Sequence, residues 1–489
     1  MTQRLITLLI LIAASTSTAL GGVHQSFSLN EEAVGIQERV AKFVDPDFYR
    51  PLTVLDQIVP NAAKAKEQPW SGSYWPLYQG GPARPYAERG YNHKRFGDNF
   101  SDFQDRLGDL ARYSSRGRFS ARDLDRLSPT EKYDLYLGDS NFTLSRAVWA
   151  SLDESDKSRK KKIETWEGMC HGWSPAAAYS KRPTHPITVP SLDGRFQLNF
   201  YPDDIKALAT LLWANSLIQD DAVVEGIRCK TNYPDRDRMS GKVTTLRCKG
   251  VNPGVFHLSM LGMIGQKHSS FVINRNNDQE VWNQPVAGYK FYYFNTKTGV
   301  SGNLANSVIE LKSFNDPFVA FRSPKSVYLV GVDMVIDYTS ETNPSHQDTD
   351  GPANDNVEQL HVRYDLELDK DYNVLGGEWV DEDGAYGANS RYIPNYPAFM
   401  WRFHSENPYA SSVVDAKLAA LAPDAVNSSS LVPLSAEASS FRYIRYAIDE
   451  DGELDRMLYD AAGNAIVAGN ELRPQPIARI VNQLQDLAH

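Results

Sequence analysis

The chain has 489 residues, of which 42% are hydrophobic and 23% are charged, as in an ordinary globular protein. The formal net charge of −10 argues against nucleic acid as a partner, because phosphate binding needs a basic surface. The length exceeds what one hydrophobic core covers, so we expect two or three domains.

The N-terminal segment, residues 1–21, has the pattern of a secretory signal peptide. Arg4 precedes an apolar run at residues 5–14, and small residues follow. No later segment reaches about 18 uninterrupted apolar residues, so no membrane span is expected. The sequence therefore predicts a secreted or periplasmic protein.

Residues 22–155 are expected to form an N-terminal mixed, largely helical region. A loop with aromatic anchors is predicted for the Trp-, Gly- and Pro-rich residues 69–86, and helices for residues 128–138 and 140–155. Ser128 and Glu131 have the spacing of a capping box, with Pro129 at the first helical position. The basic run at residues 157–162 reads as a solvated linker, or else as a processing site that would release residues 22–155 as a pro-segment.

The middle region, residues 156–300, combines helical and strand-like patterns. Residues 202–216 carry an apolar stripe with helical spacing. Residues 256–265 and 270–275 are predicted to form a β-hairpin. Beyond residue 300, strand-like runs separated by polar turns predict a β-rich C-terminal domain, residues 301–489, which closes with a short helix at residues 474–489.

The three cysteines allow at most one internal disulfide. Cys229 and Cys248 lie in similar local sequences, "IRCK" and "LRCK", on either side of a turn-rich segment. We expect them to be two strands of a loop closed by a disulfide, which would stabilise the fold by roughly 3 kcal/mol. Cys170 is then left as a free thiol in an oxidising compartment.

The segment around Cys170, "TWEGMCHGWSPAA", favours a nucleophile over the alternatives. No companion CxxC or HxxxH supports a metal site, and a buried inert cysteine is the remaining alternative. Ser174 and Pro175 signal a helix start, and a sulfur near a helix N-terminus has a lowered pKa. His171 is adjacent to Cys170, so it does not face the sulfur, and we expect it to be structural or to line a substrate site.

A nucleophilic cysteine needs a base, and His257 is a better candidate for this role than His171. His257 follows the turn "NPG" and is predicted to begin a strand, and the returning strand would bring Asn274 opposite it. The order cysteine, histidine, amide is that of papain-like enzymes, in which the third group orients the imidazole. Asp278 is a second candidate for that orienting role, and His268 is expected to lie exposed in the hairpin turn.

Two motifs resemble one known family. Residues 281–293, "VWNQPVAGYKFYY", resemble the elicitor peptide of the transglutaminases that plant-pathogenic oomycetes secrete, which have relatives in marine bacteria. "GMCHGWSPAA" resembles the active-site cysteine segment of that family. The resemblance extends over the mature chain and is most specific at residues 160–300. It implies a papain-like core, Cys170 as the nucleophile, and calcium-dependent joining of protein-bound glutamine to lysine.

The expected site extends to residues that would bind substrate and exclude water. These are Trp166, Trp173, Trp282, Asn283 and Gln284, although core packing is the alternative role of the tryptophans. Calcium would need clustered oxygen ligands, and the acidic loop with Asp348, Asp350 and Asp355 offers them, without the spacing of an EF-hand.

The expected fold class is α+β, with a papain-like catalytic core at residues 156–300 in which a helix bearing the cysteine packs on an antiparallel sheet. The expected function is a secreted transglutaminase that acts on protein substrates through a cysteine thioester. A papain-like cysteine peptidase or a glutamine deamidase is the alternative among enzymes. An inactive binding or adhesion module is the alternative from another class.

Overall fold

The computed structural model describes residues 35–158, 162–191, 194–214, 222–231, 233–276, 278–380, 396–403, 443–448, 454–459, 465–466 and 477–489. The predicted signal peptide and part of the basic run lie outside these residues. The helices are α1 (Ile36–Phe43), α2 (Leu52–Ile58), α3 (Phe96–Ser115), α4 (Ala121–Asp125), α5 (Pro129–Tyr136), α6 (Thr143–Ser158), α7 (Cys170–Tyr179), α8 (Pro202–Ala214), α9 (Pro253–Met260), α10 (Leu304–Ser307) and α13 (Ile477–Ala488).

The strands form sheets in which all pairs are antiparallel. They are β1 (Ala62–Lys64), β2 (Ile187–Pro190), β3 (Gln197–Phe200), β4 (Ala222–Gly226), β5 (Val272–Asn274), β6 (Asn283–Phe294), β7 (Ser301–Gly302), β8 (Ile309–Glu310), β9 (Tyr328–Ser340), β10 (Asn356–Leu368), β11 (Val374–Gly376), β12 (Trp379–Val380), β13 (Phe399–Phe403), β14 (Tyr443–Ile448), β15 (Leu454–Tyr459) and β16 (Ala465–Ile466). This mixture of helices and antiparallel sheet is the α+β class that the sequence predicts.

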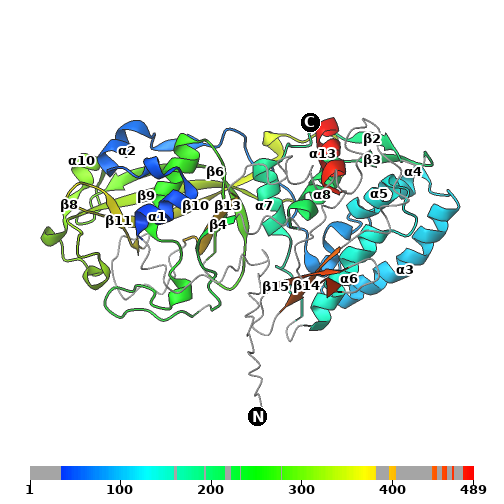
Figure 1. Cartoon of the computed structure of the whole chain (residues 1–489), viewed down its shortest axis with the longest axis horizontal. Helices are drawn as coiled ribbons and strands as arrows, with labels where there is room; N and C mark the ends of the chain where they lie inside the picture. The colour runs from blue at the N-terminus through cyan, green and yellow to red at the C-terminus, as the bar shows by residue number, and fades with distance from the viewer. Residues whose placement is uncertain are drawn as a thin grey trace, which may run out of the picture.

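The largest sheet of the described residues has 11 strands, and its main path runs β11-β10-β9-β6-β5-β13-β4. The long strands β9 and β10, which the sequence places in a C-terminal domain, are therefore continuous with β6. The sheet crosses the boundary predicted near residue 300. Figure 1 shows this sheet in one half of the molecule, the helices α3–α6 and α8 in the other half, and α7 at the junction.

Two hydrophobic cores lie on opposite faces of strands β4, β5 and β13. Val272 and Trp401 belong to the core shared with α7 and α8, whereas Ile273 and Met400 belong to the core shared with α9 and α1. This alternation follows from the period of two along a strand. Side chains of α7 and side chains of α9 are therefore separated by the sheet.

Local signals predicted several elements correctly. Ser128 and Glu131 form the expected capping box at the start of α5, and α6, α8 and α13 confirm the other three predicted helices. Trp70 and Trp75 are buried anchors of the predicted aromatic loop. In the part of the chain that the structure describes, no helix is long and apolar enough to cross a membrane.

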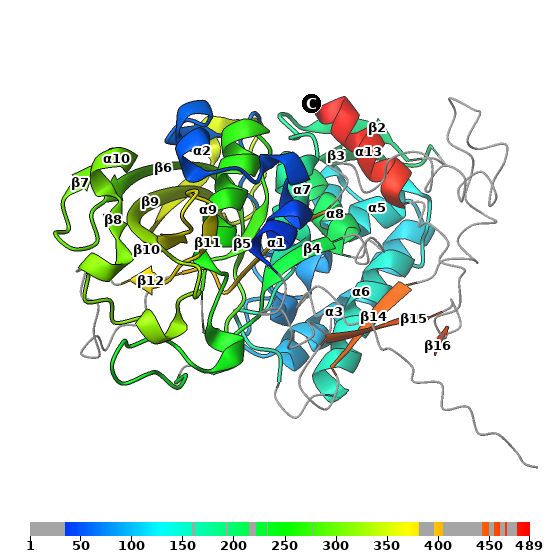
Figure 2. The same cartoon turned by 60° about the vertical axis from the view of Figure 1, so that its left-hand side comes forward.

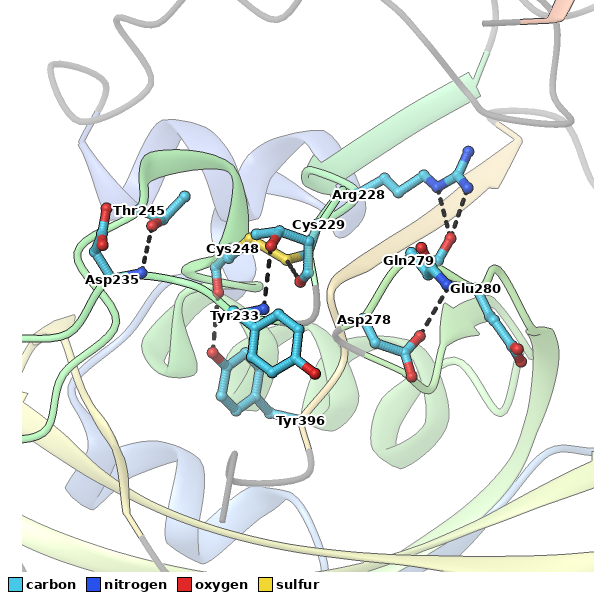
Figure 3. Close-up of a disulfide and its surroundings, with 11 residues drawn as sticks. Arg228, Cys229, Tyr233, Asp235, Thr245, Cys248, Asp278, Gln279, Glu280 and Tyr396 are labelled. Carbon is cyan, nitrogen blue, oxygen red and sulfur yellow. Dashed lines mark hydrogen bonds between the residues drawn. A yellow bond between two sulfur atoms is a disulfide. The ribbon is translucent and has the colours of Figure 1, made fainter. Parts of the chain in front are cut away.

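The predicted disulfide is confirmed. Cys229 and Cys248 are bonded, with a Cα–Cα distance of 4.5 Å, and Figure 3 shows Tyr396 donating a hydrogen bond to the Cys248 carbonyl beside them. The strands expected at the two cysteines are wrong, because Cys229 follows β4 without regular structure and Cys248 lies in a short 3-10 helix.

The predicted β-hairpin at residues 256–275 is half wrong. Its second strand exists as β5, but its first half is the helix α9, followed by a π-helical turn, Leu261–Gln266. Asn252 caps α9 by accepting hydrogen bonds from the N–H groups of Gly254 and Val255, and Pro253 occupies the first helical position. "NPG" is thus a helix start rather than a turn.

Candidate active site

The helix α7 begins at Cys170, one turn earlier than Ser174 and Pro175 predict. Pro175 lies inside the helix, where the ring is accommodated but the N–H of this position is lost. Gly172 permits the close packing of α7 on α8, because a Cβ atom there would lie 2.3 Å from the carbonyl oxygen of Thr210. The sulfur is thereby held at the N-terminus of a buried helix, between that helix and β6.

The thiol of Cys170 contacts the segment that begins β6. Its Sγ atom donates a hydrogen bond to the carbonyl of Val281 at 3.6 Å and accepts one from Nδ2 of Asn283 at 3.5 Å. The Oδ1 atom of Asn283 accepts a hydrogen bond from the indole of Trp401 at 3.0 Å. The amide of Asn283 is therefore oriented by Trp401 so that its N–H points at the sulfur.

Burial controls the protonation of this thiol. Cys170 is 6% exposed, and burial raises the pKa of its thiol to about 11, against the lowered value expected from the helix terminus alone. Three donors oppose this effect and lower the pKa: the backbone and side-chain N–H groups of Asn283 and the backbone N–H of His171. The site is thus a neutral thiol that already faces the donors that a thiolate needs.

The side chains of Tyr74 and Trp282 pack together beside the segment that carries the sulfur. Their rings lie 5.5 Å apart, and the Tyr74 hydroxyl donates to the Thr165 carbonyl at 3.0 Å. Gly168 accommodates this arrangement, because a Cβ atom there would lie 2.4 Å from both the ring and the carbonyl of Tyr74. The glycine that the sequence reserves for a close approach is thus used by Tyr74.

A carboxylate lies close enough to the thiol to act on its protonation. The Oε1 atom of Glu341 accepts a hydrogen bond from Gln284 Nε2 at 2.8 Å, and its Oε2 atom accepts one from the Ser340 hydroxyl at 3.1 Å. Its charge raises the pKa values of both Cys170 and Tyr74. Neither Tyr74 nor Glu341 is predicted from the sequence; Tyr74 lies in the aromatic loop, and no motif marks Glu341.

His257 does not meet Cys170 in this structure. It is fully buried on α9, on the opposite face of the sheet, where its Nδ1 atom lies 2.8 Å from the Tyr364 hydroxyl and its ring packs on Phe291. Burial lowers the pKa of its imidazole to about 3. The prediction that His257 serves Cys170 from a strand is therefore corrected by the helical structure of α9.

Asn274 lies on the Cys170 side of the sheet, opposite Asn283 in the pairing of β5 with β6. Its Oδ1 atom accepts a hydrogen bond from the backbone N–H of Trp282 at 3.0 Å, so it supports the segment that contacts the sulfur rather than a histidine. Asp278, the second candidate, accepts from the backbone N–H of Glu280 at 2.9 Å.

The remaining predicted residues divide between the site and the core. Trp173 is fully buried and serves core packing, His171 is buried on α7, and His268 is exposed as expected. The Trp166 indole donates to Glu164 at 2.6 Å and lies under the guanidinium of Arg228. Asn283 and Gln284 are brought to the thiol and to Glu341, respectively.

The acidic loop does not fit a calcium site. Arg182 pairs with Asp350 at 2.8 Å and with Asp355 at 2.6 Å, and Lys206 also pairs with Asp350. These cations of the chain already neutralise the carboxylates that a metal would need. Among the described residues, no group of three or more His, Cys, Asp or Glu side chains is arranged to hold a metal ion.

Comparisons with known proteins identify the family. The family model described as transglutaminase elicitor matches residues 44–422. A solved structure, the GP42 transglutaminase from Phytophthora sojae, matches with a TM-score of 0.44 and 20% identity, over 75% of this chain and 90% of that one. No curated protein matches the chain. Because the family model covers more than half of the chain, the chain belongs to the transglutaminase elicitor family.

Proposed function

We propose that this protein is an exported transglutaminase that joins protein-bound glutamine to the amine of lysine through a thioester on Cys170. The observation that carries the proposal is the position of the free thiol at the start of α7, facing the amide of Asn283 in the elicitor-like segment. Membership of the family supports the reaction class, and the disulfide is compatible with an oxidising compartment.

The proposed first half-reaction is acylation of the sulfur. Cys170 attacks the carboxamide carbon of a glutamine side chain, the carbon–nitrogen bond breaks, and the thiol proton leaves with the nitrogen as ammonia. The N–H groups around the sulfur stabilise the thiolate as it forms. Tyr74 and Trp282 limit the access of water, which favours transfer to an amine over hydrolysis.

The papain-like relationship is part of the proposal. Its support is that α7, which bears the cysteine, packs on the antiparallel strand β6. The proposal places Asn274 as a support for the Trp282 segment and leaves His257 outside the site. The calcium requirement that the family resemblance implies is a separate proposal, and an assay in calcium chloride and in EDTA tests it.

Incorporation of a labelled primary amine into casein tests the function. The wild-type protein should incorporate the amine, and Cys170→Ala should not. Casein cleavage without incorporation would instead identify a peptidase, and ammonia release without incorporation a deamidase. If the wild type and Cys170→Ala behave alike in all three assays, the protein is a binding module.

A further inference from the structure

The second half-reaction, transfer of the acyl group from Cys170 to an amine, requires a base. A lysine amine reaches the site as an ammonium ion, and it must lose a proton before its nitrogen can attack a thioester. His257 lies across the sheet from the thiol. Glu341 is the carboxylate whose charge acts on the Cys170 thiol.

We propose that Glu341 binds the ammonium group of the acceptor amine and removes its proton. This inference rests on the proposed function, because it assigns the recognition of the second substrate at the same site. It concerns only the amine step, and formation of the thioester does not require Glu341.

The path of the chain brings Glu341 and Cys170 to the same loop. The N–H of Thr342 donates to the carbonyl of Gly72 at 2.9 Å, so the end of β9 lies against the loop that carries Tyr74. The N–H of Met169 donates to the carbonyl of Tyr74 at 2.6 Å, so the same loop adjoins the residue before Cys170. The neighbours of Glu341 and of Cys170 in the chain are therefore both bonded to one short segment, residues 72–74.

The surroundings of Glu341 suit an ammonium ion. Gln284 donates a hydrogen bond to one carboxylate oxygen and Ser340 to the other, and the backbone N–H of Glu341 itself also donates to the carboxylate. A carboxylate has about four acceptor sites, so one is left for a further donor. The Oε1 atom of Gln284 is buried without a hydrogen-bond partner, in the same amide that contacts Glu341. An ammonium group has three donors, and these acceptors could receive them.

The charges around Glu341 suit a proton acceptor. Burial raises the pKa of its carboxyl group, while Arg275 lowers it. Arg275 is held by the Tyr338 hydroxyl at 2.6 Å and lies 3.5 Å from Glu358. Glu341 also acts on Cys170 and Tyr74, which are neutral at physiological pH and do not cancel the carboxylate charge.

The proton balance of the step is complete. The ammonium ion transfers one proton to Glu341, and the neutral amine attacks the thioester carbon. The carbon–sulfur bond then breaks, the second nitrogen proton passes to the leaving sulfur, and the products are an isopeptide amide and the Cys170 thiol. Glu341 finally releases its proton to solvent, so the whole step releases one proton.

Two acceptors that differ in charge test the proposal on Glu341→Gln. Cadaverine is an ammonium ion at neutral pH, whereas hydroxylamine is largely uncharged there and needs no base. With a glutaminyl-glycine donor, we expect the variant to lose roughly 100-fold in kcat/KM for cadaverine at pH 7. Ammonia release without an acceptor, and transfer to hydroxylamine, should not fall below the wild-type rates, because loss of the Glu341 charge favours the Cys170 thiolate. The cadaverine deficit should shrink as the pH rises, because free amine becomes available without a base.

Asp337→Asn is the matched control, because Asp337 lies on the same strand β9 and accepts a hydrogen bond from Gln359 at 2.9 Å. It should leave both acceptors unaffected, and Glu341→Asp should recover part of the cadaverine rate. Equal losses with cadaverine and hydroxylamine, or no loss with either, would overturn the role of Glu341. A wild-type protein that releases no ammonia and forms no acylated Cys170 would overturn the proposed function itself, and the inference with it.

Discussion

At the scale of single residues, the thiol of Cys170 is held neutral by burial rather than activated. Its pKa is raised to about 11, and the surrounding side chains, among them Tyr74 packed on Gly168, leave it 6% exposed. Substrate binding must therefore displace part of this cover or supply polar contacts to the sulfur before the thiolate forms. The same burial protects a free thiol against oxidation.

Tyr74→Ala should expose Cys170 and increase its rate of alkylation by iodoacetamide at pH 7.5. Each pKa unit that is recovered gives about tenfold more thiolate, so we expect an increase of at least about tenfold. Mass spectrometry identifies the modified site, because Cys170 is the free cysteine. The control is Tyr233→Ala, since Tyr233 is 91% exposed. Equal alkylation of both variants would contradict the covering role.

His257 should contribute to acid sensitivity and not to catalysis. Its folded pKa of about 3 lies below that of an unfolded histidine, so below about pH 6.5 the unfolded chain binds a proton that the folded chain does not. Stability should fall with decreasing pH by up to about 1.4 kcal/mol per pH unit from this group.

Urea unfolding between pH 7 and pH 4 measures this slope. His257→Gln should show a shallower loss than the wild type, and the exposed His268→Gln should not. Amine incorporation at pH 7.5 should survive in folded His257→Gln. If the folded variant had lost its activity, His257 would have a role in the mechanism.

At the scale of elements, the contact between α7 and α8 positions the sulfur. Gly172→Ala would place a Cβ atom 2.3 Å from the Thr210 carbonyl and 2.6 Å from the Ala214 side chain. We expect a loss of about 1–3 kcal/mol in the free energy of unfolding, despite the better helix propensity of alanine. Gly108→Ala in α3 is the matched control, because a Cβ atom there meets nothing within 4 Å. It should stabilise the protein by roughly 0.5–1 kcal/mol, and a similar gain for Gly172→Ala would refute the packing argument.

The helix α9 shows why the type of an element was mistaken. All eight of its residues are buried, so neither a helical nor an alternating pattern of polarity appears in the sequence. The cap formed by Asn252, with Pro253 after it, is the local signal that identifies the helix. Because this helix was predicted to be a strand, His257 was predicted to lie on the same face of the sheet as Cys170.

At the scale of the whole molecule, buried ion pairs connect α8 to the loop before β10. Lys206 is 3% exposed, donates to the Ser71 carbonyl at 2.7 Å, and pairs with Asp350. Figure 2 shows α8 and β10 in different halves of the molecule, so this pair and Arg182 hold the halves together. The carboxylates of the loop thus serve the assembly of the fold.

Lys206→Met should lower the free energy of unfolding by about 3 kcal/mol, because it leaves Asp350 buried with a partner removed. Lys157→Met is the surface control: Lys157 pairs with Asp153 at 2.6 Å but is largely exposed, and its loss should cost less than about 1 kcal/mol. Equal effects of the two substitutions in urea unfolding would show that the buried ion pair of Lys206 stabilises the fold no more than the exposed ion pair of Lys157.

Much of the local structure followed from patterns that lie close together in the chain. The capping box at Ser128, the pairing of Cys229 with Cys248 and the identity of the free cysteine were all predicted. Each depends on neighbouring residues or on the number of cysteines. The start of α7 was missed by one turn, because Pro175 is tolerated inside a helix that begins at Cys170.

The sequence by itself determined the family, the α+β class and the thiol at the centre of the candidate site. Only the tertiary structure decided which side chains surround that thiol. Asn283 contacts it and His257 does not, because the pairing of β5, β6 and β13 assigns each of these strands' residues to one face of the sheet and α9 packs on the other face. Glu341 comes near it because the end of β9 lies against the loop of Tyr74. Strand pairing joins segments that are distant in sequence, and a shift between helix and strand moves a side chain across the sheet without changing the local composition.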